Sequence, residues 1–224
     1  MRYASINLIM KKLLTIFISL LTFQHLHADQ GRDYSKSFEI LGLRLGINTL
    51  FDVASKLGNS DRFHTGEAGT SEYKVCYKVS QGDETIYLEF GSHGEMAGVP
   101  NFILTSFSLR SGQETLSYHT RCSPLNGSKI KAMTKSGLRL GISRHELRAI
   151  LGKPEKTTDN SSRYSKCIQK KVPENHALYS VLLKQEGCFP KGEKPYFDVC
   201  TTIIAEFKNS ILTRISINRI ESVC

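Results

Sequence analysis

Six cysteines are the residues of this sequence best suited to chemistry. A free cysteine with a low pKa can act as a nucleophile or bind a metal, whereas paired cysteines form disulfides in an oxidising compartment. An even number in an exported chain favours disulfides, and six cysteines allow 15 connectivities. The six are Cys76, Cys122, Cys167, Cys188, Cys200 and Cys224.

The histidines and the known catalytic motifs add no second chemistry. Beyond residue 28, no two histidines have the H-x-H, H-x-x-x-H or H-E-x-x-H spacing that is typical of metal sites. The sequence has no G-x-S-x-G, P-loop or G-x-G-x-x-G motif. A Cys–His nucleophilic pair would need a free thiol, which disulfides do not leave. We therefore expect a protein that is not an enzyme, with no metal and no cofactor.

The N-terminal segment has the pattern of a secretory signal. Lys11 and Lys12 precede an apolar run at residues 13–23, and Ala28 offers a small residue for cleavage. This run is too short to cross a bilayer as a helix, and no second run of membrane length follows. No cysteine follows it closely enough to carry a lipid anchor. We predict that residues 1–28 are a signal peptide and that the mature protein is periplasmic or secreted, without a transmembrane segment.

A duplicated hexapeptide indicates the elements that hold the cysteines. The letters GLRLGI occur at residues 42–47 and again at residues 137–142. Each copy precedes a short amphipathic segment with an N-cap residue and an acidic residue three positions later, which predicts a capped helix. A glycine follows each helix, where a left-handed C-cap is expected. These residues are Thr49, Asp52 and Gly58 in the first copy, and Ser143, Glu146 and Gly152 in the second.

Three segments rich in β-branched and aromatic residues follow the first helix, and three segments after the second helix align with them in the same order. They are residues 73–79, 85–90 and 101–110 in the first copy, and residues 162–167, 202–207 and 209–218 in the second. We therefore predict an α+β fold of two tandem repeats. Each repeat would be a short helical element packed on an antiparallel sheet of three or four strands. The predicted repeats are residues 29–122 and 123–224.

The alignment also predicts which cysteines pair. It equates Cys76 with Cys167, and it places Cys122 and Cys224 after the last strand of their repeats. One disulfide within each repeat then leaves Cys188 for Cys200, which would close an insertion near residues 172–200. The predicted pairs are Cys76–Cys122, Cys167–Cys224 and Cys188–Cys200.

Two insertions that the repeats do not share are the predicted contact elements. The first repeat adds a glycine-rich loop at residues 91–100, and the second adds residues 172–197. Each could present side chains to a partner, or fold back over the sheet. The predicted partner-binding residues are His93, Glu95, Met96, Val99, Phe189, Tyr196 and Phe197.

The charge is distributed unequally between the repeats. Residues 29–122 hold 9 basic and 12 acidic residues, and residues 123–224 hold 18 basic and 9 acidic ones. The basic second repeat is either a solvated surface or a face that attracts an acidic protein or an anionic envelope component. Nucleic acid is a poor fit, because export removes it and the basic residues are not interleaved with aromatic ones. Lysines gather around the second insertion: Lys166, Lys170, Lys171, Lys184, Lys191 and Lys194.

Residues 137–154 resemble the opening of the β-lactamase-inhibitor-protein-like fold, which outer-membrane-assembly lipoproteins of the SmpA/OmlA type share. The matching residues are Gly137, Gly141, Ser143, Glu146, Leu147, Leu151, Gly152 and Pro154. The first copy matches less fully, through Gly42, Gly46, Thr49, Asp52, Val53, Leu57 and Gly58. The resemblance implies a turn and helix on an antiparallel sheet, in tandem, and a binding role. The chain lacks a lipobox cysteine, and no inhibitory contact residue can be transferred.

These features favour an exported, non-catalytic protein-binding module, such as an inhibitor or an envelope interaction factor. Its partner would be another protein, or an anionic envelope component bound by the basic second repeat. One alternative is a periplasmic factor for envelope assembly or structure. Another is a hydrolase whose site is formed between the repeats.

Overall fold

The computed structural model describes residues 34–65, 72–93, 102–112, 121–125, 130–172 and 195–222. The predicted signal peptide lies outside these ranges. The segment from Tyr34 to Cys224 forms one compact unit. Within the described ranges, no helix is long and apolar enough to cross a membrane.

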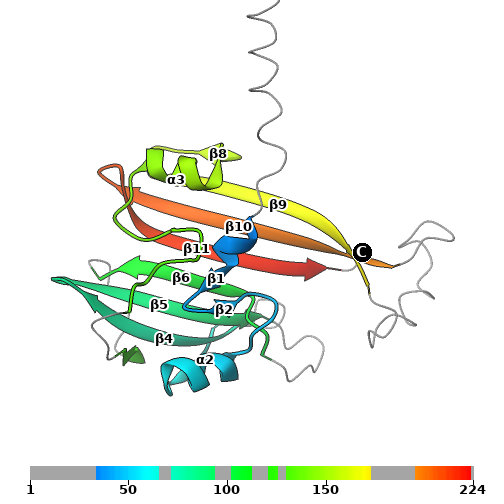
Figure 1. The fold of residues 1–224 in the computed structure, drawn as a ribbon, viewed down its shortest axis with the longest axis horizontal. Helices are drawn as coiled ribbons and strands as arrows, with labels where there is room; N and C mark the ends of the chain where they lie inside the picture. The colour runs from blue at the N-terminus through cyan, green and yellow to red at the C-terminus, as the bar shows by residue number, and fades with distance from the viewer. Residues whose placement is uncertain are drawn as a thin grey trace, which may run out of the picture. The chain divides into compact units, whose positions relative to one another are not determined.

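An antiparallel sheet dominates this unit (Figure 1). Its strands lie in the order β3-β4-β5-β6-β11-β10-β9-β8, and β7 pairs in parallel with β4. A separate two-stranded ladder joins β1 (Glu39–Ile40) and β2 (Leu43–Arg44). The strands of the first half are β3 (Arg62–Thr65), β4 (Glu72–Gln81), β5 (Glu84–His93), β6 (Ser106–Ser111) and β7 (Ser123–Pro124). Those of the second half are β8 (Lys156–Thr157), β9 (Ser161–Lys171), β10 (Tyr196–Lys208) and β11 (Ile211–Ser222).

The described helical elements confirm the helix starts predicted from sequence. After a short 3₁₀ helix, η1 (Tyr34–Phe38), they are α2 (Leu50–Leu57) and α3 (Arg144–Leu151). Thr49 accepts a hydrogen bond at Oγ1 from the Asp52 N–H, and the Asp52 carboxylate accepts one from the Thr49 N–H at 2.7 Å. Ser143 and Glu146 form the same reciprocal box. Each box satisfies backbone donors that a helix start would otherwise leave open.

The hexapeptide GLRLGI forms a turn that attaches each helix to a distant strand segment. Its second glycine has a positive φ in both copies, 73° at Gly46 and 83° at Gly141. The Gly46 N–H donates to the Leu104 carbonyl at 2.7 Å, and the Gly141 N–H donates to the Leu212 carbonyl at 2.9 Å. The turn prediction is therefore confirmed. The glycines after the helices differ from prediction, because Gly58 combines its positive φ of 91° with an extended ψ of 166° instead of a left-handed helical one.

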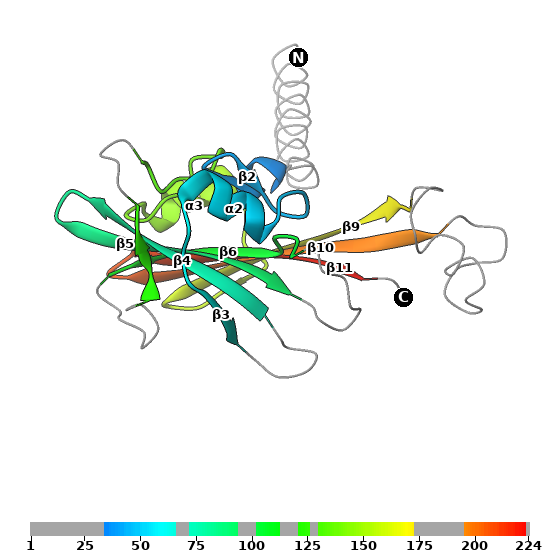
Figure 2. The ribbon, with the colours of Figure 1, turned by 90° about the horizontal axis from the view of Figure 1, so that it is seen from below.

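Both helices and the β1–β2 ladder cover the same face of the sheet (Figure 2). The core lies between these layers, because alternate residues of each strand point toward the helices. Leu50 and Val53 of α2 and Leu147 and Leu151 of α3 are buried in it. The central sheet residues beneath them are Tyr77, Leu88, Leu109, Ile217, Ile203 and Tyr164. The predicted α+β class therefore agrees with the structure, and the strands predicted for the two repeats join edge to edge through β6 and β11.

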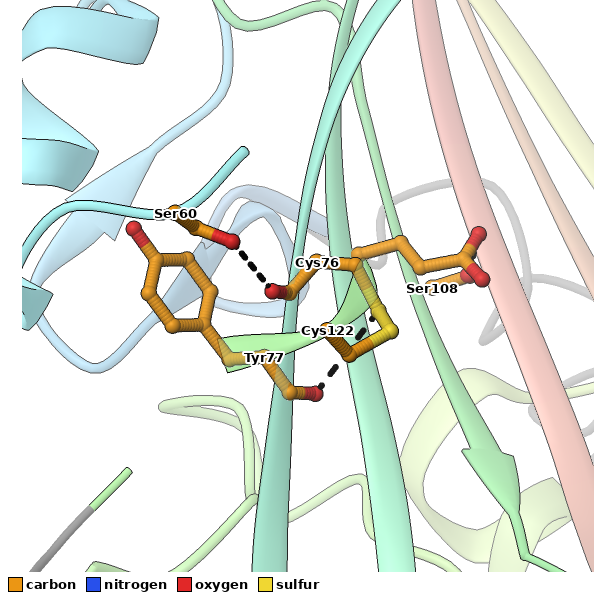
Figure 3. The surroundings of a disulfide bond; sticks show 6 residues. Ser60, Cys76, Tyr77, Ser108 and Cys122 are labelled. Atoms are coloured by element: carbon orange, nitrogen blue, oxygen red, sulfur yellow. Dashed lines mark hydrogen bonds between the residues drawn. A yellow bond between two sulfur atoms is a disulfide. The ribbon is translucent and has the colours of Figure 1, made fainter. Parts of the chain in front are cut away.

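The first predicted disulfide is confirmed, and the other two pairings are wrong. Cys76 is bonded to Cys122, and the Ser60 hydroxyl donates to the Cys76 carbonyl beside it at 2.7 Å (Figure 3). Cys167 is bonded to Cys200 and not to Cys224. The reason is register, because Cys167 and Cys200 are direct partners on β9 and β10 with Cα atoms 4.0 Å apart. Cys188 and Cys224 lie outside the described residues.

Candidate protein-binding surface

The two predicted contact loops leave the sheet at the same end. His93 is the last residue of β5, and Tyr196 is the first residue of β10. The strands β6 and β11 separate them, and every pairing between these four strands is antiparallel. The end of β5 and the start of β10 therefore share one end of the sheet, which we call the loop end. Three strand spacings, about 14 Å, separate the two strands.

The two exits are not level with each other. Gly91 of β5 and Thr202 of β10 lie on one row across the sheet. His93 is two residues beyond this row, whereas Tyr196 is six residues beyond it. The β9–β10 pair therefore reaches about four residues, or ~13 Å, farther than β5. The two insertions therefore leave from one end of the sheet, but their exit points lie at different heights along it.

The predicted contact residues are only partly described. Tyr196 and Phe197 are half-buried and lie opposite Lys171 and Lys170 of β9. His93 is placed by its backbone, opposite Glu72 of β4. The others lie outside the described residues: Glu95, Met96, Val99 and Phe189.

An aromatic cluster that the sequence analysis did not predict lies at the loop end. Phe102 follows the first insertion, and its ring lies 5.6 Å from that of Phe51 and 5.3 Å from that of Tyr73, both edge to face. The His64 ring lies 5.0 Å from the Tyr73 ring. The Arg62 guanidinium sits over both phenylalanines, 5.1 Å and 4.8 Å from their centroids. We call Phe51, Arg62, His64, Tyr73 and Phe102 the aromatic cluster.

Four segments of the first half position this cluster. The helix α2 supplies Phe51, and the register of β3 with β4 places His64 opposite Tyr73. The Phe102 carbonyl accepts a hydrogen bond from the Leu50 N–H at 2.9 Å, which holds Phe102 against the start of α2. Phe102 has a φ of 41°, a left-handed conformation that is unfavourable for a bulky residue by about 1–2 kcal/mol. Its edge-to-face contacts and the guanidinium above it offset this strain.

The cluster is exposed enough to contact a partner. Phe51 exposes 56% of its surface, and the adjoining Ile103 exposes 40%. Arg62 and His64 are exposed as well. Aromatic residues and arginine are the types that carry most of the binding energy at protein interfaces. The arrangement therefore offers a prearranged apolar surface with a cation above it.

One sequence signal could have identified the cluster. Leu50, Val53 and Leu57 form the apolar stripe of α2, and Phe51 lies one position off that stripe. A large aromatic residue on the solvent face of a short helix does not pack in the core beneath that helix. Nothing in the sequence indicated that Tyr73 and Phe102 belong to the cluster, because both occur in segments predicted to be strands.

Among the described residues of the second half, no equivalent aromatic cluster is found. His145 occupies the second position of α3, as Phe51 does in α2, and it is exposed. Ser210 has a positive φ of 65° one residue before Ile211, as Phe102 does before Ile103. In this half, the Arg144 guanidinium lies 4.3 Å from the centroid of the Phe207 ring. The corresponding place therefore carries polar side chains.

The face of the sheet opposite the helices carries glutamates that are engaged in hydrogen bonds. The Glu72 carboxylate accepts a hydrogen bond from the Ser106 hydroxyl at 2.6 Å and pairs with Lys74 at 2.8 Å. Glu89 accepts one from the Ser108 hydroxyl at 3.3 Å. These contacts give both carboxylates a structural use on neighbouring strands. Among the described residues, no group of three or more His, Cys, Asp or Glu side chains could hold a metal ion.

The shifted pKa values belong to the scaffold. Hydrogen bonds from Thr49 hold the pKa of Asp52 below its usual value, and those from Ser143 do the same for Glu146. Burial raises the pKa of Tyr77 and of Tyr164 to about 12. These groups cap the helices or pack in the core, so their shifts report on folding and not on a reactive site.

Comparison with known proteins assigns no relative. No protein-family model, curated protein or solved structure matches the chain significantly.

Proposed function

We propose that the chain is an exported, non-catalytic protein-binding module that contacts its partner through the loop end of its sheet. The observation that carries the proposal is the exposed aromatic cluster, which stands beside the exit of the first insertion. The second insertion leaves from the same end. A rigid sheet that presents aromatic anchors next to variable loops is a common arrangement for protein recognition.

The finer architecture we propose is a pair of tandem repeats. Two isolated bridges support it: Thr49 pairs with Ile103, and Ser143 pairs with Ile211. These bridges join the N-cap of each helix to the start of the last strand segment of the same half. The resemblance to the β-lactamase-inhibitor-protein-like fold also implies helices on one face of an antiparallel sheet. Because the chain has this arrangement, we propose that its fold is related to that one.

The ladders support the same symmetry. Tyr77 lies opposite Leu88, which lies opposite Leu109. In the second half, the corresponding row contains Tyr164, Ile203 and Ile217. Each row begins with a buried tyrosine and is filled by aliphatic residues that face the helices.

The differences between the proposed repeats indicate where function lies. The residues that attach each helix to its strand are alike in the two halves. The surface residues at the helix starts differ, with Phe51 and Phe102 in one half and His145 and Ser210 in the other. Because the two halves share the scaffold residues and only the first half has aromatic residues at its helix start, we place the binding surface on the first half. The two disulfides and the predicted signal support a periplasmic or secreted location.

Affinity capture with matched variants tests the proposal. Phe51→Ser removes the exposed anchor, whereas His145→Ser changes the corresponding exposed position of α3. We expect Phe51→Ser to reduce the yield of a specific partner at least tenfold, because central aromatic residues contribute about 2 kcal/mol or more. His145→Ser should leave the yield unchanged.

A second matched pair compares Ile103→Ser with Ile211→Ser, at residues with exposures of 40% and 42%. The prey should come from both the envelope fraction and the culture medium, and the fraction that contains the partner separates a periplasmic factor from a secreted one. Equal capture by all four variants would show that the aromatic cluster is not the binding surface.

A further inference from the structure

The outer edge of β9 is largely uncovered by other strands. Its only outer neighbour among the described residues is β8, which pairs with Ser162 and Arg163. From residue 164 to Lys171, no described strand lies on that side. The edge is exposed over much of this stretch, at residues 165 and 167–171. An edge of this length is a template for an added strand.

The backbone groups that face outward can be identified. The Arg163 carbonyl accepts a hydrogen bond from the Glu155 N–H, so Arg163 points its backbone groups away from β10. Outward groups alternate along an antiparallel strand, which places those of Ser165, Cys167 and Gln169 on the same side. The Val172 N–H donates to the Pro195 carbonyl in the opposite direction, as the alternation requires. The outward groups from Ser165 to Gln169 span about 13 Å.

This edge is held rigid. The strand β9 pairs with β10 without interruption from Ser161 to Lys171. The disulfide between Cys167 and Cys200 ties the two strands together at the centre of the outward stretch. A preordered edge loses little conformational entropy when a second strand is added, which favours binding.

The side chains of β9 select the kind of strand that would fit. Four are basic, and no acidic residue occurs between Ser161 and Lys171: Arg163, Lys166, Lys170 and Lys171. Lys166, Ile168 and Lys170 share the helix side of the strand, and Ile168 between the lysines exposes 53% of its surface. Among the described residues, Glu155 lies 3.8 Å from Arg163, before the outward stretch, and Asp198 of β10 is the register partner of Gln169.

A second copy of the chain is disfavoured as the occupant. Antiparallel pairing of two β9 strands about Cys167 would place Arg163 opposite Lys171 at both ends. Like charges that face each other across a ladder are destabilising. The charge of the edge instead complements an acidic chain.

We propose that the edge of β9 from Ser165 to Gln169 binds an extended acidic polypeptide segment as an additional strand. The backbone of the segment pairs with the outward groups of β9. Its side chains follow an acidic-x-apolar-x-acidic pattern, so that carboxylates meet Lys166 and Lys170 and an apolar residue meets Ile168. This surface goes beyond the proposed function and is separate from the aromatic cluster, because five strand spacings, about 24 Å, lie between β4 and β9.

Peptide titration against the full mature protein tests the proposal. The probe is a labelled heptapeptide of threonines with glutamate at positions 2 and 6 and valine at position 4, blocked at both termini. The controls are the same peptide with glutamines in place of glutamates, a peptide of equal composition with adjacent glutamates, and a backbone N-methylated version. We expect fluorescence anisotropy to show binding of the probe, at least tenfold weaker for every control.

Protein variants test the same contacts from the other side. Gln169→Pro removes an outward N–H without removing a hydrogen bond to β10, and Lys166→Gln with Lys170→Gln removes the charges. Both changes should reduce the affinity for the probe at least tenfold, while Phe51→Ser should leave that affinity unchanged. The N-methylated peptide provides the same test if the proline variant does not fold.

Three results would overturn the proposal. The first is no binding of the probe up to about 1 mM. The second is equal binding of the peptide with adjacent glutamates or of the N-methylated peptide, which would show charge attraction without strand addition. The third is displacement of the probe by polyphosphate together with wild-type affinity of Gln169→Pro, which would identify a general polyanion surface. None of these results bears on the aromatic cluster, which the capture experiment tests independently.

Discussion

Tyr77 and Tyr164 provide a controlled test of the packing between the helices and the sheet. Both side chains are buried, with 0% and 1% of their surface exposed. The Tyr77 hydroxyl donates a hydrogen bond to the Gly58 carbonyl at 2.7 Å, just past the end of α2. The Tyr164 hydroxyl is buried with no hydrogen-bond partner among the described residues. The same substitution, tyrosine to phenylalanine, should therefore have opposite effects at the two positions.

The magnitudes follow from what each hydroxyl contacts. Tyr77→Phe removes one hydrogen bond, but Gly58 is exposed, so water can satisfy its carbonyl after the change. We expect a loss of about 1 kcal/mol in the free energy of unfolding, near the mean for a single hydrogen bond. Tyr164→Phe removes a polar atom that is desolvated without compensation, so we expect a gain between 0 and about 1 kcal/mol.

Urea unfolding with the disulfides intact measures both values. The slope of free energy against urea should match the wild type, so that the shift in midpoint reports stability alone. The expected difference between the two variants is about 1–2 kcal/mol, with Tyr164→Phe the more stable. Equal destabilisation by both substitutions would refute the reasoning, since it would mean that the Tyr164 hydroxyl is hydrogen-bonded, for example to a buried water.

Alkaline pH gives an independent readout of the same burial. Burial raises the pKa of each tyrosine from 10.0 to about 12 in the folded protein. Between these pH values the unfolded chain releases the tyrosine proton and the folded chain keeps it. The contribution of each tyrosine to the free energy of unfolding is therefore fully present below pH 10 and is lost as the pH rises toward 12. Either phenylalanine variant should lose stability less steeply over this range. If stability falls with pH as steeply in both variants as in the wild type, the two tyrosines do not have raised pKa values.

Three further predictions follow from the described contacts. Glu146→Gln should make unfolding less sensitive to acid, because hydrogen bonds from the N-cap lower the folded pKa of Glu146 and this stabilisation is lost as the pH falls below about 4.5. Thermal unfolding at pH 6 and pH 3 measures the effect, and an equal drop in melting temperature for variant and wild type would contradict it. Gly58→Ala should destabilise the fold by about 1–3 kcal/mol, because a φ of 91° with a ψ of 166° lies in a region that essentially only glycine adopts; an unchanged urea midpoint would reject this. Peptide mapping without reduction should recover both observed disulfides and a third between Cys188 and Cys224, and free thiols at these two would disprove that pairing.

The sequence was most informative where structure depends on neighbouring residues. The capping boxes at Thr49 and Ser143 need only a hydroxyl and a carboxylate three residues apart, and both formed as predicted. The turn glycines of GLRLGI were likewise predictable, because a positive φ followed by an N-cap is a local requirement. The bond between Cys76 and Cys122 was predicted from one disulfide per repeat, and it forms because β7 brings Cys122 next to β4.

Strand register was not predictable from matching letters. The sequence alignment equates Tyr73 with Tyr164, but under the proposed repeat symmetry the ladders make Tyr164 the counterpart of Tyr77. Moving the second half by four residues carries Cys167 away from the position of Cys76 and opposite Cys200. Nothing local distinguishes these registers, because an even shift keeps every apolar residue on the same face. The failed disulfide pairing is a direct consequence of that ambiguity.

The proposed binding surface was only partly predictable for a related reason. The insertions are visible in the sequence as unmatched segments, and their exit points at His93 and Tyr196 follow from strand order. The aromatic cluster joins a helix, two strands and a loop, and its most distant members, Phe51 and Phe102, are brought together by long-range backbone hydrogen bonds. Contacts of this kind appear only when the fold is known.

The two proposed surfaces divide the work between the halves of the sheet. The first half is acidic overall and presents aromatic rings and one guanidinium at the loop end, a surface suited to an apolar anchor. The second half is basic and presents a rigid strand edge, suited to an extended acidic chain. Because β9 runs toward the loop end, a partner with a folded body and an acidic tail could reach both. The scaffold residues that are alike in the halves then keep the two surfaces about 24 Å apart, while the residues that differ decide what binds.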